Sequence, residues 1–530
     1  MDHHMKFGMP MLKPFVPEKV GIVAYLLMAL FFQLSAAIYL GALPEIMGED
    51  GLTRYDVLML LYCNLGGLAL WFPMLFRMKF RFSHHALMMG SALGIIVCYG
   101  LMMWLEQFGR AALPAMWLVC FVQGALKLEG TFECMSSIQL WITPKRNFAV
   151  FFPVLHLILM GAIQANGILV KYLAYYAHYW HMNYLVIGLM LLIVLFQWVC
   201  CRPFRPMFVP LKGVDWLGML LWGAFFGQVA WLFNYGDWVD WQLSATWRLV
   251  VWSAVVTLVL NLIRMKLLPK PYISPLVFRT RNYLPILLIT IVVEMLMGTE
   301  HAVEEVFTEE VMGWSAMQSV SLGYVKLAGC LVGALFALWW MGLNRWNYFR
   351  LYTFGIFLAV LYHAGFYFQI STDILPQTLW TSAFLCGMAT SILSATMLVI
   401  LNGMFDFEHF FQGLGIFQFI HVMVGGAIGA GFYNTLLGHF VQDNLARYSQ
   451  HVDWVMLSRQ YAHPLQAMSA EMPALMHRVM EVSIKQCFGI VLLMGITLLI
   501  ACLLYKHPVR RHLSPMPLWN AFGRKIKKSI

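Results

Sequence analysis

Charged residues are scarce in this sequence. Asp, Glu, Lys and Arg make up only 11% of its 530 residues, whereas apolar residues make up 61%. A soluble globular domain carries about 25% charged residues, so the composition excludes a soluble protein. The short alternating apolar and polar segments that mark a transmembrane β-barrel are also absent. The chain is therefore predicted to be an all-α integral membrane protein.

Motifs for disulfides and metals are lacking as well. The ten cysteines fall mostly inside apolar runs, and neither CxxC nor HExxH spacing occurs. Cysteine in such a run ordinarily acts as a small apolar residue, so we expect no disulfide framework, no metal site and no cofactor. The net charge of +10 lies in connections and in the C-terminal tail. This distribution suits a membrane surface, and no nucleic-acid partner is expected.

Apolar runs of about 20 residues recur along the whole chain, as spanning helices require. We count fourteen of them, and most of the 35 Lys and Arg residues lie in the connections on one side. The positive-inside rule makes that side cytoplasmic, so both termini are predicted to be cytoplasmic. The long polar connection at 440–483 then lies outside. Its pattern predicts an amphipathic helix on the outer leaflet or a docking surface for a partner.

Five stretches carry a resemblance to a known family: "AAIYLGALPEI" (36–46), "FRMKFRF" (76–82), "FVQGA" (121–125), "NYGDWVDW" (234–241) and "YISPLVFRTRNYL" (272–284). They are similar to segments of the major facilitator superfamily, in particular its fourteen-helix drug:proton antiporter branch. The motifs are degenerate, because Ser35, Leu40 and Cys120 stand where that branch has Asp, Asn and Arg. Sequences with this set of substitutions resemble a Bacteroidetes subgroup of the branch.

The resemblance implies two six-helix bundles around a central cavity, joined by two linker helices. The N-terminal bundle would cover 1–201, the linker helices 202–270, and the C-terminal bundle 271–505 with an external loop at 440–483. A basic cytoplasmic tail would occupy 506–530. The implied function is multidrug-type efflux, in which hydrophobic or amphipathic small molecules are exported across the inner cell membrane in exchange for protons. Implied partners are a periplasmic adaptor and an outer-membrane channel.

Three ionisable residues interrupt the fourth apolar run, in "QGALKLEGTFEC" (123–134): Lys127, Glu129 and Glu133. An ionisable residue at bilayer depth costs about 2.5–3.5 kcal/mol and normally faces a cavity or a partner. Glu129 and Glu133 are four residues apart and share a helix face, so one of them would hold a proton or pair with a cation. Lys127 is the nearest cation, although its face differs. Proton or substrate handling and a structural ion pair both stay open.

The ninth run is richer in acids. At 100° per residue, Glu294, His301 and Glu305 fall within about 40° of one another on a helix. A carboxylate–imidazole–carboxylate ladder of this kind can pass a proton, because His titrates near neutrality. Glu300 and Glu304 form an adjacent row. We predict that the ladder takes part in proton coupling.

Further cations flank these runs. Lys326, inside the tenth run, either neutralises Glu294 or binds an anionic substrate. Arg77, Lys79 and Arg81 follow the second run and mainly determine topology. The resemblance implies that these three residues also latch the cytoplasmic gate.

Two other functions stay open. The chain would export or passively carry one lipid-like or siderophore-like metabolite if its buried charges only hold the two bundles together. An intramembrane metalloenzyme built on His301 and Glu305 is favoured least, because that group contains only one His. We therefore predict a transporter without enzymatic activity.

Overall fold

The described residues of the computed structural model are 12–35, 43–144, 147–203, 211, 213–371, 374–449 and 464–504. The predicted basic tail at 506–530 lies outside them. A few side chains within these ranges, that of His301 among them, also lie outside the description.

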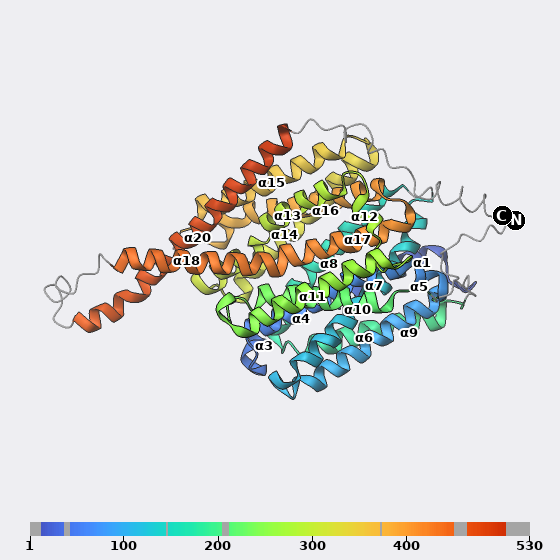
Figure 1. Cartoon of the computed structure of the whole chain (residues 1–530), viewed down its shortest axis with the longest axis horizontal. Coiled ribbons are helices and arrows are strands. Elements are labelled where there is room, and N and C mark those ends of the chain that lie inside the picture. The colour runs from blue at the N-terminus through green and yellow to red at the C-terminus, as the bar shows by residue number, and fades with distance from the viewer. Residues whose placement is uncertain are drawn as a thin grey trace.

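Almost all of the described chain is helical (Figure 1), and no strand longer than an isolated bridge occurs in these ranges. Within the described ranges, thirteen helices are long and apolar enough to cross a membrane. A further apolar helix, α1 (Glu18–Leu34), has 17 residues and therefore spans about 26 Å, close to the hydrocarbon thickness of a bilayer. The prediction of an all-α, multi-pass membrane protein is confirmed, and the predicted count of fourteen spans is close to the structure.

We call the helices before residue 201 the N-terminal half and those after residue 272 the C-terminal half. The N-terminal half contains α1, α3 (Leu43–Asp50), α4 (Arg54–Trp71), α5 (Leu75–Arg81), α6 (His84–Glu106), α7 (Leu113–Ile142), α8 (Phe148–Tyr176) and α9 (His181–Cys200). Two linker helices follow, α10 (Trp216–Asn234) and α11 (Ala245–Leu267). The C-terminal half contains α12 (Pro275–Arg279), α13 (Tyr283–Met297), α14 (Ala316–Ala337), α15 (Tyr348–Gln369), α16 (Trp380–Met404), α17 (Phe407–Val422), α18 (Gly429–Ser449) and α20 (Pro464–Leu504).

Two glycines let helices approach closely where the candidate site lies. A Cβ atom on Gly124 of α7 would lie 1.8 Å from the backbone oxygen of Asn64 on α4. A Cβ atom on Gly387 of α16 would lie 2.1 Å from the backbone oxygen of Lys326 on α14. Small residues are the usual means of close helix packing in membranes. They fix the depth at which Lys127 and Lys326 sit in their halves.

The linker helix α10 is fastened to α4. Tyr235 donates a hydrogen bond to Asp56 (O–O 2.6 Å), and Asn234 donates one to the backbone oxygen of Tyr55 (N–O 2.7 Å). Burial raises the pKa of the Tyr235 hydroxyl above its usual value, so this group remains a hydrogen-bond donor at neutral pH. On its other side, α10 stacks Phe226 against Phe419 of α17, with ring centroids 3.8 Å apart. The linker thus lies between the two halves.

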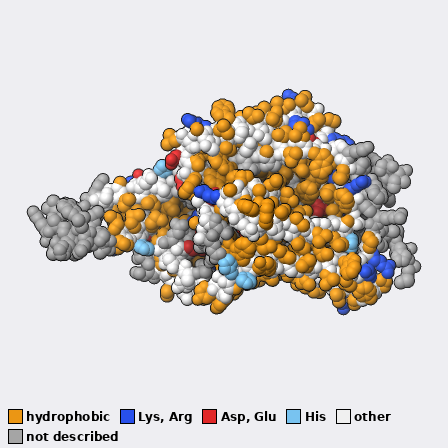
Figure 2. Space-filling view, turned by 90° about the horizontal axis from the view of Figure 1, so that it is seen from below, with side chains coloured by type: hydrophobic (Ala, Val, Ile, Leu, Met, Phe, Trp, Pro, Cys, Tyr) orange, Lys and Arg blue, Asp and Glu red, His pale blue; other side chains and the backbone are white. Residues whose placement is uncertain are grey.

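The molecular surface agrees with a lipid environment. Apolar side chains cover much of the described surface in Figure 2. Large apolar residues are widely exposed on several helices, for example Leu118 (66%), Trp198 (70%) and Trp252 (69%). Exposed apolar area on this scale is unfavourable in water and favourable against lipid.

The last two long helices overturn one expectation. Residues His409–Ser449 form one continuous helix of 41 residues, and α20 also has 41 residues. Each is about 60 Å long, roughly twice the hydrocarbon thickness. Figure 1 shows α18 and α20 projecting side by side beyond the other helices. Asn444 of α18 bonds Ser483 and Gln486 of α20, at 2.9 Å each.

The prediction that 440–483 forms a helix lying flat on the outer leaflet is therefore wrong for its described parts, because these helices extend away from the bundle. We call α18 and α20 the hairpin, and the end of the molecule from which they project the hairpin end. The opposite end, where α5 lies (Figure 1), is called the α5 end.

Candidate functional site

A buried ionic cluster lies in the C-terminal half around Lys326. Its Nζ atom lies 3.0 Å from Oε1 of Glu300 and 2.8 Å from Oε1 of Glu304. Tyr362 donates to Oε2 of Glu304 (2.7 Å), and the Cys386 thiol donates to Oε2 of Glu300 (3.5 Å). Lys326 is 9% exposed and Glu304 4%. We call these five residues the Lys326 cluster, and it places two carboxylates against one ammonium group.

Two π-helical segments, Glu300–Glu304 and Val306–Val311, continue α13. The first of them carries both carboxylates of the Lys326 cluster. A π-helix has a wider turn than an α-helix and occurs frequently at functional sites. Successive side chains therefore advance by a smaller angle than on an α-helix. Glu300 and Glu304, four residues apart, both lie on the side that meets Lys326.

The π-helical geometry also breaks the predicted ladder of Glu294, His301 and Glu305. Glu294 lies against α17, where its Oε1 is 2.7 Å from Nδ1 of His421. Glu305 faces α4, where its Oε2 is 3.6 Å from Nη2 of Arg54. The two acids thus have different partners on different helices, and the His301 side chain lies outside the described residues. The expected row failed because it assumed a regular α-helix throughout.

One of the two predicted roles of Lys326, the neutralisation of Glu294, is wrong. Glu294 was the expected partner if the lysine neutralised an acid, but the structure pairs it with Glu300 and Glu304. These two acids form the row next to the one that the sequence favoured.

Ion pairs join the two halves at the hairpin end. Besides the Arg54–Glu305 pair, Lys171 of α8 lies 3.3 Å from Oε1 of Glu309 and donates to Ser319 of α14 at 2.9 Å. Glu309 lies on the second π-helical segment of the C-terminal half, and Glu305 lies between the two segments. One stretch of chain, Glu300–Val311, therefore carries the carboxylates of the Lys326 cluster and both acids that contact the N-terminal half.

The halves also meet at the α5 end, through aromatic rings. Phe76 of α5 lies 4.2 Å from Phe411 of α17 between ring centroids, and Phe132 of α7 lies 5.7 Å from the same ring. Contacts between the halves are therefore present at both ends of the molecule.

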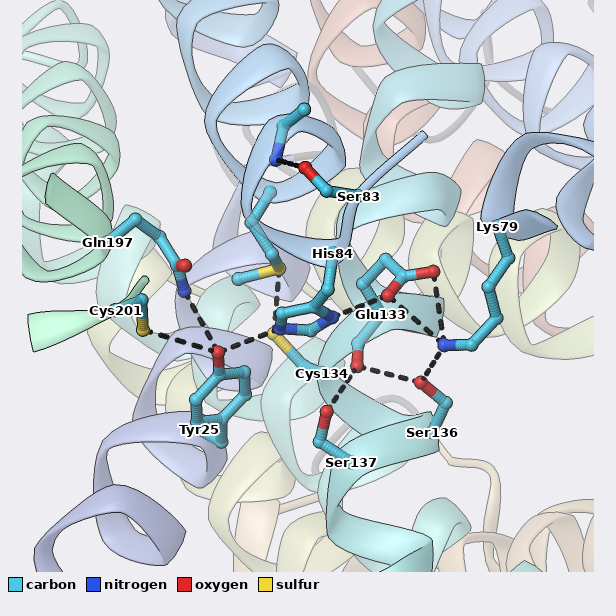
Figure 3. Close-up of polar contacts among 12 residues, drawn as sticks. Tyr25, Lys79, Ser83, His84, Glu133, Cys134, Ser136, Ser137, Gln197 and Cys201 are labelled. Atoms are coloured by element: carbon cyan, nitrogen blue, oxygen red, sulfur yellow. Dashed lines mark hydrogen bonds and ion pairs between the residues drawn. The ribbon is translucent and has the colours of Figure 1, made fainter. Parts of the chain in front are cut away.

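A second ionic cluster lies in the N-terminal half (Figure 3). Oε2 of Glu133 is 3.1 Å from Nζ of Lys79 and 2.5 Å from Nδ1 of His84. On its other side, His84 lies 2.7 Å from the hydroxyl of Tyr25, which accepts a hydrogen bond from Gln197 at 3.2 Å. Polar contacts thus connect five helices at the α5 end. We call these residues the Glu133 cluster.

The three charges of the fourth predicted span do not act as one group. Glu129 accepts a hydrogen bond from the Trp71 indole at 2.7 Å, while Glu133 belongs to its own cluster. Lys127 is only 4% exposed and pairs with neither acid. The expectation that Lys127 is their local partner is wrong, because its side chain lies on another face of α7.

Of the predicted gate loop, Arg77, Lys79 and Arg81 all lie on the short helix α5. Lys79 turns toward the N-terminal half, since it also donates to Ser136 at 2.6 Å and lies 5.3 Å from the centroid of Phe132. The loop is thus anchored to α7 through Glu133 and Phe132.

Several residues of the two clusters and of the ion pairs between the halves were not singled out from the sequence. Arg54, His84 and Lys171 lie near helix ends, where charged residues are common, and nothing local distinguishes them. Glu300 and Glu304 offered a usable signal, because two acids four residues apart next to an apolar run require a partner. Among the described side chains, no group of three or more His, Cys, Asp or Glu is placed to hold a metal ion.

Comparison with known proteins defines the fold. No protein-family model and no curated protein matches the sequence. Solved structures do match over nearly the whole chain. The peptide transporter POT (E310Q mutant, in complex with alafosfalin) has a TM-score of 0.56 and 15% identity, over 96% of this chain and 98% of its own. The nucleoside transporter NupG has a TM-score of 0.52 and 11% identity, over 92% and 100%.

The human organic anion transporter MFSD10 (TETRAN) has a TM-score of 0.50 and 12% identity, over 91% of this chain and 100% of its own. The fold is that of major facilitator transporters. The identities show the fold alone, so the predicted drug:proton antiporter branch stays a prediction. The expected absence of enzymatic activity also stays a prediction.

Proposed function

We propose that this chain is a proton-coupled secondary transporter that exports hydrophobic or amphipathic small molecules by alternating access. The observation that carries the proposal is the Lys326 cluster. Two carboxylates face one ammonium group in a buried site, so one negative charge is in excess when both acids are ionised. Uptake of one proton neutralises this excess negative charge. A proton added to a site with balanced charges would instead leave a buried positive charge.

The position of the cluster links a proton to the motion of the halves. Glu304 belongs to the cluster, and the next residue, Glu305, contacts Arg54 across the interface. A change in the packing of the π-helical segments around Lys326 would therefore also change the ion pairs at the hairpin end. Because the halves touch at both ends, we interpret this arrangement as an occluded state between inward-open and outward-open forms.

We further propose that the α5 end faces the cytoplasm of an inner cell membrane, with both termini on that side. The basic residues of α5 support this orientation. Protons would then enter from the hairpin end, and substrate would leave there.

The test is transport by the full chain reconstituted in liposomes, screened over dyes and amphiphiles with an imposed pH gradient. Glu304→Gln should still exchange substrate at equilibrium but should no longer accumulate it against a gradient. Lys326 keeps Glu300 as a partner in this variant, so the protein should fold. Glu481→Gln is the matched control, because it removes a carboxylate paired with Lys485 within α20. Full gradient-driven accumulation by a Glu300→Gln/Glu304→Gln double variant would contradict the proposal.

A second candidate is an exporter or uniporter of one lipid-like or siderophore-like metabolite. The pairs Arg54–Glu305 and Lys171–Glu309 favour it, because they are charges that join the two halves. Under this candidate, transport would be independent of the pH gradient in the unmodified protein. The liposome experiment therefore separates the two functions directly.

We also propose that the hairpin binds a periplasmic adaptor that leads to an outer-membrane channel. Its projecting helices expose Met472 (37%) and Met476 (36%) beside Arg478. Replacing both methionines by Ser should reduce the recovery of an adaptor that co-purifies with the native chain. Unchanged recovery would count against this docking surface, and the exposed Leu493 in the lipid-facing part of α20 provides a control position.

A further inference from the structure

Lys127 is a buried cation with no counter-charge among the described side chains. Its side chain is 4% exposed, and no described group forms a hydrogen bond or ion pair with it. Lys326 is similarly buried but meets two carboxylates. A charged side chain inside the membrane normally faces a partner. Lys127 therefore requires an anion that the protein does not supply from its described residues.

The two acids nearest to Lys127 in the sequence have other partners. Glu129 follows Lys127 by two residues and so points about 160° away around α7, where it accepts from Trp71. Glu133 is held by Lys79 and His84. The segment "AAIYLGA" (36–42), which follows α1, contains no ionisable acid in its sequence.

The face of α7 that carries Lys127 lies in the seam between α1 and α4. One turn before it, Gln123 donates to the backbone oxygen of Ser35 at 2.8 Å, and one turn after it, Thr131 accepts from Gln33 of α1 at 3.0 Å. Asn64 of α4 donates to the backbone oxygen of Cys120 at 3.3 Å. Polar contacts to both neighbouring helices thus flank the lysine.

Two acceptors on this seam have no donor among the described residues. They are the side-chain oxygens of Gln123 and Asn64, and both are buried. A buried acceptor without a donor is unfavourable. The seam therefore presents one cation and two acceptors without described partners, the acceptors lying one to two helical turns before Lys127 along α7. Their complement is an acid group with an N–H or O–H donor next to it.

We propose that Lys127 binds the acid group of the transported molecule, and that Gln123 and Asn64 accept hydrogen bonds from a donor beside it. The substrate class is then small organic anions that carry a hydroxyl, amide or amino group near the acid. This inference rests on the proposed transport function and narrows it, because it excludes amphipathic cations as the preferred substrates.

The test compares matched acids and amides on the purified full chain. Mandelate and indole-3-lactate are measured against their primary amides and against tetraphenylphosphonium, by thermal stabilisation and by counterflow in liposomes. The unmodified protein should prefer each acid over its amide by at least about tenfold. Lys127→Gln should lose this preference, and Lys127→Arg should keep part of it. Lys485→Gln, in the hairpin, should behave as the unmodified protein does.

Lys127→Gln leaves no described group without its partner, so this variant should fold. Lys127→Met provides a second neutral variant. Equal response to acids and amides, preference for the cation, or unchanged preference in both neutral variants would overturn the proposal. Proton coupling is measured separately. If the preference for acids persists while the pH gradient has no effect on transport, the proposed proton coupling is refuted and this inference stands.

Discussion

The two ionic clusters show how similar charges can serve different purposes in the two halves. The Glu133 cluster sets one carboxylate against one lysine, Lys79, and the ring of His84. The Lys326 cluster sets two carboxylates against one lysine. The first fastens α5 to α7 at one end of the molecule. The carboxylates of the Lys326 cluster lie on a stretch, Glu300–Val311, that also carries two acids in contact with the N-terminal half. A proton taken up by this cluster would therefore affect the contacts between the halves.

The largest effect is expected for Lys326→Met, which leaves Glu300 and Glu304 facing each other without a cation. Removal of one partner from a buried ion pair costs about 3–5 kcal/mol. The thermal unfolding temperature in detergent should fall strongly, and addition of Glu304→Gln should recover part of the loss. Lys485→Met is the matched control. If the Lys326→Met protein were as stable as the unmodified chain, Glu300 and Glu304 would not need a cation, and the two clusters would not differ in this respect.

Glu133→Gln should have the next largest effect. Lys79 and His84 then face an uncharged amide, and loss of a charged hydrogen-bond partner costs about 1–3 kcal/mol. We expect lower thermal stability and slower transport, while accumulation still responds to the pH gradient. If Glu133→Gln abolished the response to the gradient and Glu304→Gln did not, the roles of the two clusters would be reversed.

A smaller difference is expected between two single acids, Glu294 and Glu129. Glu294 pairs with His421 between two helices of the C-terminal half, so Glu294→Gln should lower gradient-driven transport about tenfold, equivalent to about 1.4 kcal/mol. Glu129→Gln keeps an oxygen for Trp71 and should change transport much less. Initial rates in liposomes at equal protein amounts measure both. Equal losses would mean that the N-terminal half contributes to coupling, as the sequence pattern of α7 suggests.

The smallest effect is expected for Arg54→Gln. This pair with Glu305 is partly exposed, at 23% and 32% for the two side chains, and such pairs contribute about 0.2–1 kcal/mol. The hairpin end should open more often, which cross-linking of Tyr172→Cys to Tyr324→Cys by a short bismaleimide reports, since the two tyrosine side chains meet at their tips, with hydroxyls 3.0 Å apart. Cross-linking should slow in Arg54→Gln and in Glu305→Gln. In the double variant, the effects should not add.

The sequence predicted the class and the number of spans well, because a run of about 20 apolar residues rarely occurs outside a membrane-spanning helix. It also identified most of the buried charges, since each stands out in an apolar run. It did not predict their partners. Lys79 meets Glu133 across 54 residues, and Lys171 meets Glu309 across 138. Contacts of that range depend on how helices pack, and no pattern within one helix encodes them.

The π-helical segments explain the remaining failure. A wheel at 100° per residue placed Glu305 beside Glu294 and away from Glu304. In the structure Glu305 contacts Arg54 and Glu294 contacts His421, so the two acids do not form one row. The sequence "GTEHAVEEVFTEE" contains no local signal for the π-helical turns.

The two long helices of the hairpin have a mechanical consequence. They continue from within the C-terminal half, and each is about 30 Å longer than the hydrocarbon core of a bilayer is thick. A tilt of that half by about 10° would displace a point about 30 Å away by about 5 Å. Under the proposed alternating access, the far end of the hairpin would therefore move by several ångströms in each transport cycle.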